Sequence, residues 1–118
     1  MSKILVADDA SFMRLMIRQV LARKGYTDIF EAENGRLAVE LYKLNRPSLT
    51  LLDITMPELD GLTALTEILA FDPQAKIVMC SAVAQESMVL DALSRGALDF
   101  VTKPFRPDDL LQTVNKYL

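Results

Sequence analysis

Several apolar runs in this sequence end in side chains that could do chemistry. Those side chains are Asp8 and Asp9 after the first run, then Asp53, Ser81 and Lys103 after three later runs. Carboxylates are costly to bury unless a cation or a reaction requires them. Ligands of open α/β sheets bind at the carboxyl ends of the strands. The pattern therefore predicts a polar site along one edge of a parallel sheet.

The elements that would position these residues alternate five times between strand-like and helix-like stretches. The expected strands are residues 4–7, 28–32, 49–52, 76–80 and 98–102, and the expected helices are residues 10–24, the stretches after Asn34-Gly35 and Asp60-Gly61, residues 84–95, and the stretch from Pro107. This alternation predicts an α/β fold of (βα)5 type, with right-handed crossovers and helices on both faces. Strands this apolar fit a doubly wound parallel five-stranded sheet that is buried on both sides. We expect residues 1–118 to form a single domain.

Some local features of these elements carry expectations of their own. The first expected helix has apolar residues at helical spacing, namely Phe12, Met13, Met16, Ile17, Val20 and Leu21. Gly25 and Gly96 are expected to end helices, because glycine adopts the left-handed conformation easily. We interpret Asn34-Gly35 as a turn into a helix and the Glu31/Glu33 pair as a solvated edge.

The composition of the chain argues against some classes of binding partner and suggests a cellular location. The 118-residue chain has a net charge of −3 and a pI near 4.9, which argues against nucleic-acid binding, since that needs a basic face. We expect no membrane partner, because no apolar run approaches the roughly 20 residues that span a bilayer. The start of the chain leads directly into the first expected strand, with no sign of a signal peptide. The single cysteine, Cys80, cannot form an internal disulfide. These features suggest a cytoplasmic protein.

The acidic residues predict a metal site. In a doubly wound sheet of order 2-1-3-4-5, the first and third strands are neighbours, so Asp8, Asp9 and Asp53 would meet in one crevice. Their mutual repulsion is relieved by Mg²⁺, which prefers hard oxygen ligands and keeps some of its waters. We expect Asp9 and Asp53 to hold the metal, with Asp8 assisting through a water. The backbone carbonyl of Thr55 is a further expected ligand.

This donor set suits phosphoryl transfer to a carboxylate. An aspartate can act as the nucleophile and form an aspartyl phosphate. We assign this role to Asp53, because it ends the central strand. The transferring group spreads negative charge over its oxygens, which require positioned cations and donors. Lys103 and Ser81 are each expected to bind one phosphoryl oxygen.

The candidate residues occur in a fixed order along the chain: Asp8-Asp9, Asp53 with Met56-Pro57 and Gly61, Ser81-Ala82, and Lys103-Pro104. With these residues, the chain resembles a response-regulator receiver domain of the CheY type over essentially its whole length. The resemblance implies the flavodoxin/CheY-like strand order 2-1-3-4-5, which the alternation of elements does not give by itself. It also implies a cis Lys103-Pro104 bond. The stretches 9–14 and 53–57 look most like the chemotaxis branch.

The resemblance implies a role in two-component signal transduction. A partner histidine kinase would donate the phosphoryl group from its own phosphohistidine, and this chain has no histidine that could supply one. Phosphorylation would draw the Ser81 hydroxyl toward the phosphoryl group and turn Phe100 inward. The face formed by the fourth helix, fifth strand and fifth helix would then select a downstream protein. Such a protein is not an enzyme in the usual sense, since it catalyses only its own phosphorylation and slow dephosphorylation.

Dephosphorylation depends in this family on two positions beside the path of the attacking water. These positions are Thr55 and Val83 here. Because neither residue is a strong base, we expect assisted self-dephosphorylation to be modest.

Other interpretations of the same residues remain open at the level of sequence. Asp8, Asp9 and Asp53 could cap helices, Ser81 could belong to a turn, and Lys103 could be solvated. A phosphorelay intermediate or the receiver of a transcription factor would share every motif. A haloacid-dehalogenase-type phosphatase also uses an aspartate nucleophile with magnesium, but it places a second aspartate where this chain has Thr55.

Overall fold

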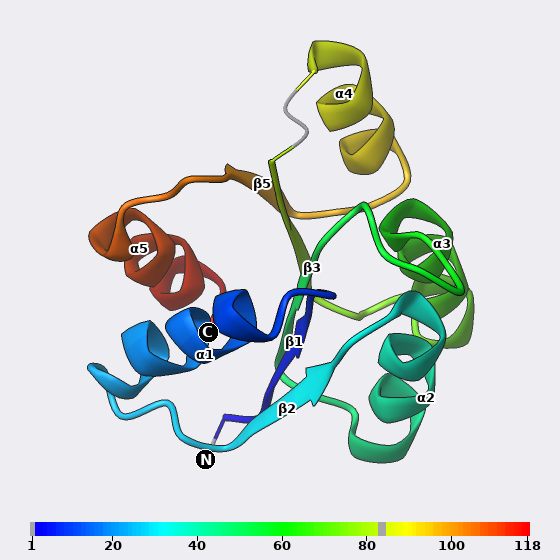
Figure 1. The fold of residues 1–118 in the computed structure, drawn as a ribbon. Coiled ribbons are helices and arrows are strands. Elements are labelled where there is room, and N and C mark those ends of the chain that lie inside the picture. Colours follow the sequence, from blue (N-terminus) through cyan, green and yellow to red (C-terminus); the bar gives the residue numbers. More distant parts are fainter. Residues whose placement is uncertain (1, 83–84) are drawn as a thin grey trace.

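A five-stranded parallel sheet with helices on both faces forms the molecule, in a computed structural model that describes residues 2–82 and 85–118 (Figure 1). The strand order is β2-β1-β3-β4-β5, which confirms the expected doubly wound topology. The elements in chain order are β1 (Ile4–Ala7), α1 (Ser11–Ala22), β2 (Ile29–Ala32), α2 (Gly35–Asn45), β3 (Leu49–Leu52), α3 (Gly61–Phe71), β4 (Ile77–Ser81), α4 (Glu86–Ser94), β5 (Asp99–Thr102) and α5 (Pro107–Tyr117).

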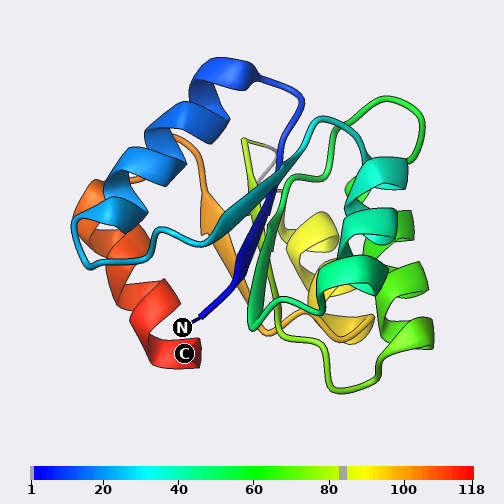
Figure 2. The same cartoon turned by 90° about the horizontal axis from the view of Figure 1, so that it is seen from below.

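The helices divide into two layers. Helices α1 and α5 lie together on one face of the sheet, and α2, α3 and α4 lie on the other (Figure 2). Successive strand residues point to opposite faces, so β1 supplies Leu5 to the core under α2 and α3, and Ile4 and Val6 to the core under α1 and α5. Burial on both faces explains why the strands are almost wholly apolar.

The sheet register determines which polar residues meet. Ala7 at the end of β1 pairs with Leu52 at the end of β3, so the next residues of both strands leave the sheet side by side. Ser81 pairs with Thr102, which brings the end of β4 to the residue before Lys103. The carboxyl ends of β1, β3, β4 and β5 therefore share one edge, as the sequence pattern predicts.

Only part of the apolar pattern in α1 faces the core. Ile17, Val20 and Leu21 are buried, but Phe12 is 69% exposed and Met16 is 39% exposed. Phe12 and Met16 are four residues apart, so they share a stripe beside the buried one. The spacing thus predicts the helix correctly but overstates its buried face.

The Asn34-Gly35 pair leads into α2, as expected, and Asn34 is the N-cap of that helix. The Asn34 side chain accepts a hydrogen bond from the Leu37 amide at 2.7 Å and caps α2. Gly35 is the first helical residue, and a Cβ atom there would lie 1.9 Å from the carbonyl oxygen of Leu59. Gly25 and Gly96 do have positive φ angles, +80° and +113°, as expected where helices end.

Among the residues that the structure describes, none of the helices combines the length and the apolar character that a bilayer crossing requires.

Candidate functional site

Three carboxylates gather at the carboxyl edge of the sheet. One oxygen from each of Asp8, Asp9 and Asp53 lies within 4.8 Å of the other two. Asp8 and Asp53 are buried, with 2% and 7% of their surface exposed, whereas Asp9 is exposed. The expected meeting of these residues is therefore what the fold produces, with one carboxylate open to solvent and two inside.

The sheet holds the two buried carboxylates by continuing its hydrogen bonds beyond the strand ends. The Asp8 amide donates to the carbonyl of Ala32 at 3.0 Å, and the Asp53 amide donates to the carbonyl of Ala7 at 3.0 Å. Backbone fixed in this way has little freedom to move its side chains apart. The carboxylates thus remain close despite their repulsion.

The chain after Asp53 packs tightly against the start of α3. The Gly61 amide donates to the carbonyl of Ile54 at 2.7 Å, and a Cβ atom at Gly61 would lie 1.8 Å from the carbonyl oxygen of Asp53. Asp60 caps α3 by accepting from the Thr63 amide at 2.8 Å. Glycine is therefore required where the helix begins, because any side chain there would push the Asp53 backbone away.

Lys103 supplies the positive charge of the site. Its amide donates to the carbonyl of Ser81 at 3.0 Å, and its peptide bond to Pro104 is cis, as the resemblance implies. Its ammonium group forms ion pairs with Asp8 and, at 3.4 Å, with Oδ2 of Asp53. Only 11% of the lysine side chain is exposed. Lys103 thus bridges the two buried carboxylates and is not a solvated lysine.

The electrostatics of Asp53 favour a further cation. Burial raises the pKa of Asp53, and Asp8 raises it further. The charge of Lys103, the Ile54 amide at 2.7 Å and a hydrogen bond with the Ser81 side chain lower that pKa, but they do not restore its usual value. The ionised Asp53 that a nucleophile requires is therefore under-stabilised by the protein alone.

Lys103 keeps its charge in this setting. Burial lowers the pKa of Lys103, but the hydrogen bond to Asp8 and the charge of Asp53 outweigh burial and raise it. With one ammonium group facing three carboxylates, the site still lacks positive charge. Carboxylate oxygens so close together are the ligands that Mg²⁺ prefers, so the donor set fits this ion.

The remaining expected site residues lie around this centre. Ser81 is the last residue of β4 and is buried. Phe100 is partly buried and packs against the core on the α2 and α3 face. Thr55 has an exposed side chain, and Val83 lies outside the described residues.

The capping interpretations of the acidic residues do not hold. The N-cap of α1 is Ala10, and no side chain accepts a hydrogen bond there. Asp8 Oδ1 instead accepts from the Ala10 amide at 2.9 Å, and Asp53 Oδ1 accepts from its own neighbour Ile54. Since Asp60 caps α3, neither buried aspartate is explained by a helix start.

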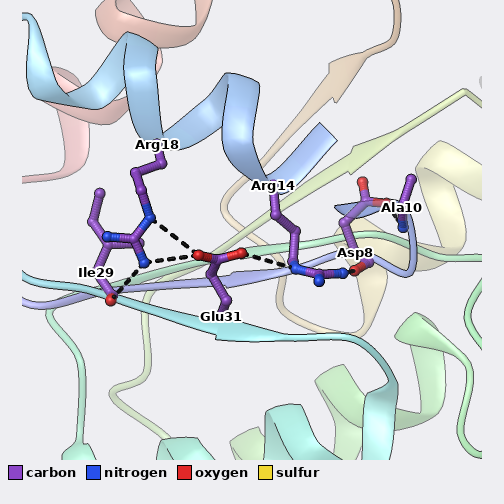
Figure 3. A network of polar contacts seen from close by, with 6 residues as sticks. All are labelled: Asp8, Ala10, Arg14, Arg18, Ile29 and Glu31. Atoms are coloured by element: carbon purple, nitrogen blue, oxygen red, sulfur yellow. Dashed lines mark hydrogen bonds and ion pairs between the residues drawn. The ribbon is translucent and has the colours of Figure 1, made fainter. Parts of the chain in front are cut away.

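One polar network beside the site was missed by the sequence pattern. Glu33 is exposed, as expected for a solvated edge, but Glu31 is only partly exposed and forms ion pairs with Arg14 at 2.9 Å and Arg18 at 2.8 Å (Figure 3). The two arginines are four residues apart and therefore share one face of α1. That spacing was the available signal, but only the fold shows which acid they meet.

Known proteins are similar to this chain in sequence and fold. The family model for the response regulator receiver domain matches residues 4–115. The chain is 54% identical over 116 residues to the chemotaxis protein CheY of Bacillus subtilis, covering 98% of this chain and 97% of that protein. It is 46% identical over 114 residues to the chemotaxis protein CheY of Thermotoga maritima, covering 97% and 95%.

A solved structure that includes a CheY protein has a similar fold. The crystal structure of the CheX-CheY-BeF3-Mg+2 complex from Borrelia burgdorferi contains a chain that superimposes with a TM-score of 0.94 at 36% identity. The match covers 98% of this chain and 87% of that one.

Proposed function

This chain belongs to the response regulator receiver domain family, and from that premise we propose that it is a chemotaxis-type response regulator phosphorylated on Asp53. The chemotaxis assignment is supported by CheY relatives that match nearly the whole chain at 54% and 46% identity. We propose that residues 1–118 act as one receiver domain. In this proposal phosphorylation changes which protein the chain binds. The only reactions that the chain catalyses are its own phosphorylation and slow dephosphorylation.

Asp53 is the proposed nucleophile. One of its carboxylate oxygens attacks the phosphorus of a phosphohistidine on a partner kinase, forming a P–O bond as the P–N bond breaks. The imidazole nitrogen leaves with the electron pair and is neutralised by a proton. This role is supported by the position of Asp53 next to Lys103 and Ser81, whose donors can stabilise the charge on the transferring group.

Asp8, Asp9, Asp53 and the backbone carbonyl of Thr55 are the proposed ligands of Mg²⁺. The ion supplies the positive charge that lets a phosphoryl group approach three carboxylates. The Lys103 ammonium, held between two carboxylates in this structure, is proposed to bind one phosphoryl oxygen. The Ser81 hydroxyl is proposed to donate to another.

The output surface is proposed to be the face formed by α4, β5 and α5. When Ser81 moves toward the phosphoryl group, Phe100 would turn inward and reshape this face. Leu90, Leu93 and Leu98 are 58%, 41% and 41% exposed in this part of the molecule, so apolar side chains are available to a downstream protein. A histidine kinase is the proposed phosphodonor.

The observation that carries this proposal is the meeting of three carboxylates and one buried lysine at the strand ends. It is tested by mixing the protein with a small acyl phosphate, with Mg²⁺ or with a chelator, and measuring intact mass. We expect a metal-dependent gain of one phosphoryl group that Asp53→Asn abolishes. The matched control is Asp28→Asn. Asp28 lies just before the amino end of β2, away from the carboxyl ends of the strands, so this variant should be phosphorylated normally. Phosphorylation of Asp53→Asn, or equal phosphorylation without Mg²⁺, would refute the proposal.

A further inference from the structure

Arg14 connects helix α1 to the backbone of the acidic site. Its Nη1 donates to the carbonyl oxygen of Asp8 at 2.7 Å, and its Nε donates to Oε1 of Glu31 at 2.9 Å (Figure 3). The side chain is only 15% exposed. One guanidinium group thus joins an acid on β2 to the residue that begins the β1–α1 loop.

Glu31 is well placed to anchor this arrangement. It pairs with Val6 in the sheet register, and the next residue, Ala32, accepts the hydrogen bond of the Asp8 amide. Arg18 occupies the second oxygen of Glu31 with bonds of 2.8 and 3.0 Å. Both oxygens of Glu31 are therefore engaged, and its carboxylate is fixed relative to the strand beside the site.

The charge state of Glu31 fits an anchoring role. Burial raises the pKa of Glu31, but the hydrogen bonds and charges of Arg18 and Arg14 outweigh burial and lower it. The carboxylate is thus ionised wherever the protein is folded near neutral pH, and it holds Arg14 in one orientation.

The shape of arginine matters at this position. The planar guanidinium group donates in two fixed directions, so Arg14 reaches Glu31 and Asp8 at once. The ammonium group of lysine is a flexible point charge on a different stem and does not reproduce this fork. Arg14→Lys therefore keeps the charge and removes the geometry.

We propose that Arg14, oriented by Glu31, is a positioning residue that holds the backbone of Asp8 and thereby sets the Asp8 and Asp9 carboxylates for binding a divalent cation. This inference rests on the proposed function, because it assigns the cation to those carboxylates. Asp8 is then held at its amide by β2, at its carbonyl by Arg14, and at its carboxylate by Ala10 and Lys103.

Charge and position make opposite predictions for Arg14. If the arginine acted only as a nearby positive charge, its removal would strengthen the binding of a cation. If it positions Asp8, its removal weakens cation binding although repulsion is reduced. Groups that orient metal ligands typically affect affinity by about 10- to 100-fold. We expect the lower end, because Arg14 contacts the main chain of a ligand residue and not its carboxylate.

The test compares Arg14→Lys and Arg14→Ala with the matched variants Arg18→Lys and Arg18→Ala. Arg18 shares Glu31 and also donates to the carbonyl of Ile29 at 3.3 Å, but it has no hydrogen bond to Asp8. Mg²⁺ affinity is measured by calorimetric titration, and hydrogen exchange of the Ala10 amide is measured by NMR without metal. Urea unfolding of each variant reports any general loss of stability.

We expect both Arg14 variants to weaken Mg²⁺ binding about tenfold and to speed exchange of the Ala10 amide. The Arg18 variants should lose similar stability and keep the wild-type Mg²⁺ affinity. Equal losses of affinity in the Arg14 and Arg18 variants, tighter Mg²⁺ binding in Arg14→Ala, or unchanged Ala10 exchange would each overturn the inference. A wild-type protein that binds no Mg²⁺ at all would instead refute the proposed function on which the inference rests.

Discussion

Replacing Asp53 by asparagine should stabilise the protein when no divalent cation is present. The pKa of Asp53 is raised by burial and by Asp8, so the folded protein holds the charged form less favourably than the unfolded chain does. Asparagine has nearly the same shape and no charge. The substitution therefore removes a penalty at the centre of the site while leaving its packing intact.

The magnitude follows from the distances in the site. At an effective dielectric constant of about 20, two carboxylates whose oxygens lie within 4.8 Å of each other repel by at least about 3.5 kcal/mol, and Lys103 at 3.4 Å attracts Asp53 by about 5 kcal/mol. The repulsion of Asp53 by Asp8 and Asp9 together slightly exceeds its attraction to Lys103. Solvent weakens the repulsion by Asp9, because Asp9 is exposed. Burial of the charge adds to the penalty. We therefore expect Asp53→Asn to raise the free energy of unfolding by about 1–2 kcal/mol.

With saturating Mg²⁺, the wild type should become more stable than Asp53→Asn. A ligand present at 100 times its dissociation constant stabilises the folded state by about 2.7 kcal/mol, and the variant lacks one of the proposed ligands. The assay is urea unfolding followed by circular dichroism, with a chelator and then with saturating Mg²⁺. Asp28→Asn is the control and should change little in either condition.

The dependence on pH gives a second check of the same reasoning. Because the pKa of Asp53 is raised, its charge lowers the free energy of unfolding by the full amount above that pKa. This destabilisation disappears as the pH falls toward the usual pKa of 3.8. The advantage of Asp53→Asn should shrink over that interval. A variant that is less stable than the wild type in chelator at neutral pH would refute the argument.

Three further outcomes are expected. Lys103→Met should destabilise the metal-free protein by about 3 kcal/mol in urea unfolding, because Asp8 and Asp53 lose their shared cation; unchanged stability would show that the ion pairs contribute little. Gly61→Ala should cost about 1–3 kcal/mol and slow phosphorylation by acyl phosphate, since its methyl group collides with the Asp53 carbonyl; an unperturbed rate would contradict the close approach. The pKa of Glu31 is lowered, so its contribution to stability is present above the usual value of 4.5 and is lost as the pH falls through the lowered pKa. Glu31→Gln should therefore flatten the acid limb of an unfolding-versus-pH profile, and identical profiles would argue against this ion network.

The local sequence pattern predicts the number and type of the elements but not the order of the strands in the sheet. Short apolar runs predict the five strands and apolar residues at helical spacing predict the five helices, because both patterns depend only on nearby residues. The order 2-1-3-4-5 was expected from the resemblance and not from the pattern, since nothing local decides which strands become neighbours. The fold confirms that order, and with it the meeting of the carboxylates from β1 and β3.

Adjacent residues in the sequence can also differ in ways that only packing decides. Asp8 and Asp9 look equivalent in the chain, yet Asp8 is buried against Lys103 and Asp9 faces solvent. Phe12 and Ile17 both fit the apolar stripe of α1, but only Ile17 reaches the sheet.

The (βα)5 alternation and the polar residue types at the strand ends can be predicted from the chain alone, because both depend on short stretches of residues. The ion pairs of Lys103 with Asp8 and of Arg14 with Glu31 join residues 95 and 17 positions apart, and they follow only from the folded arrangement. Such contacts depend on strand register and helix packing, which are set by the burial of both sheet faces at once. No local pattern encodes that collective result.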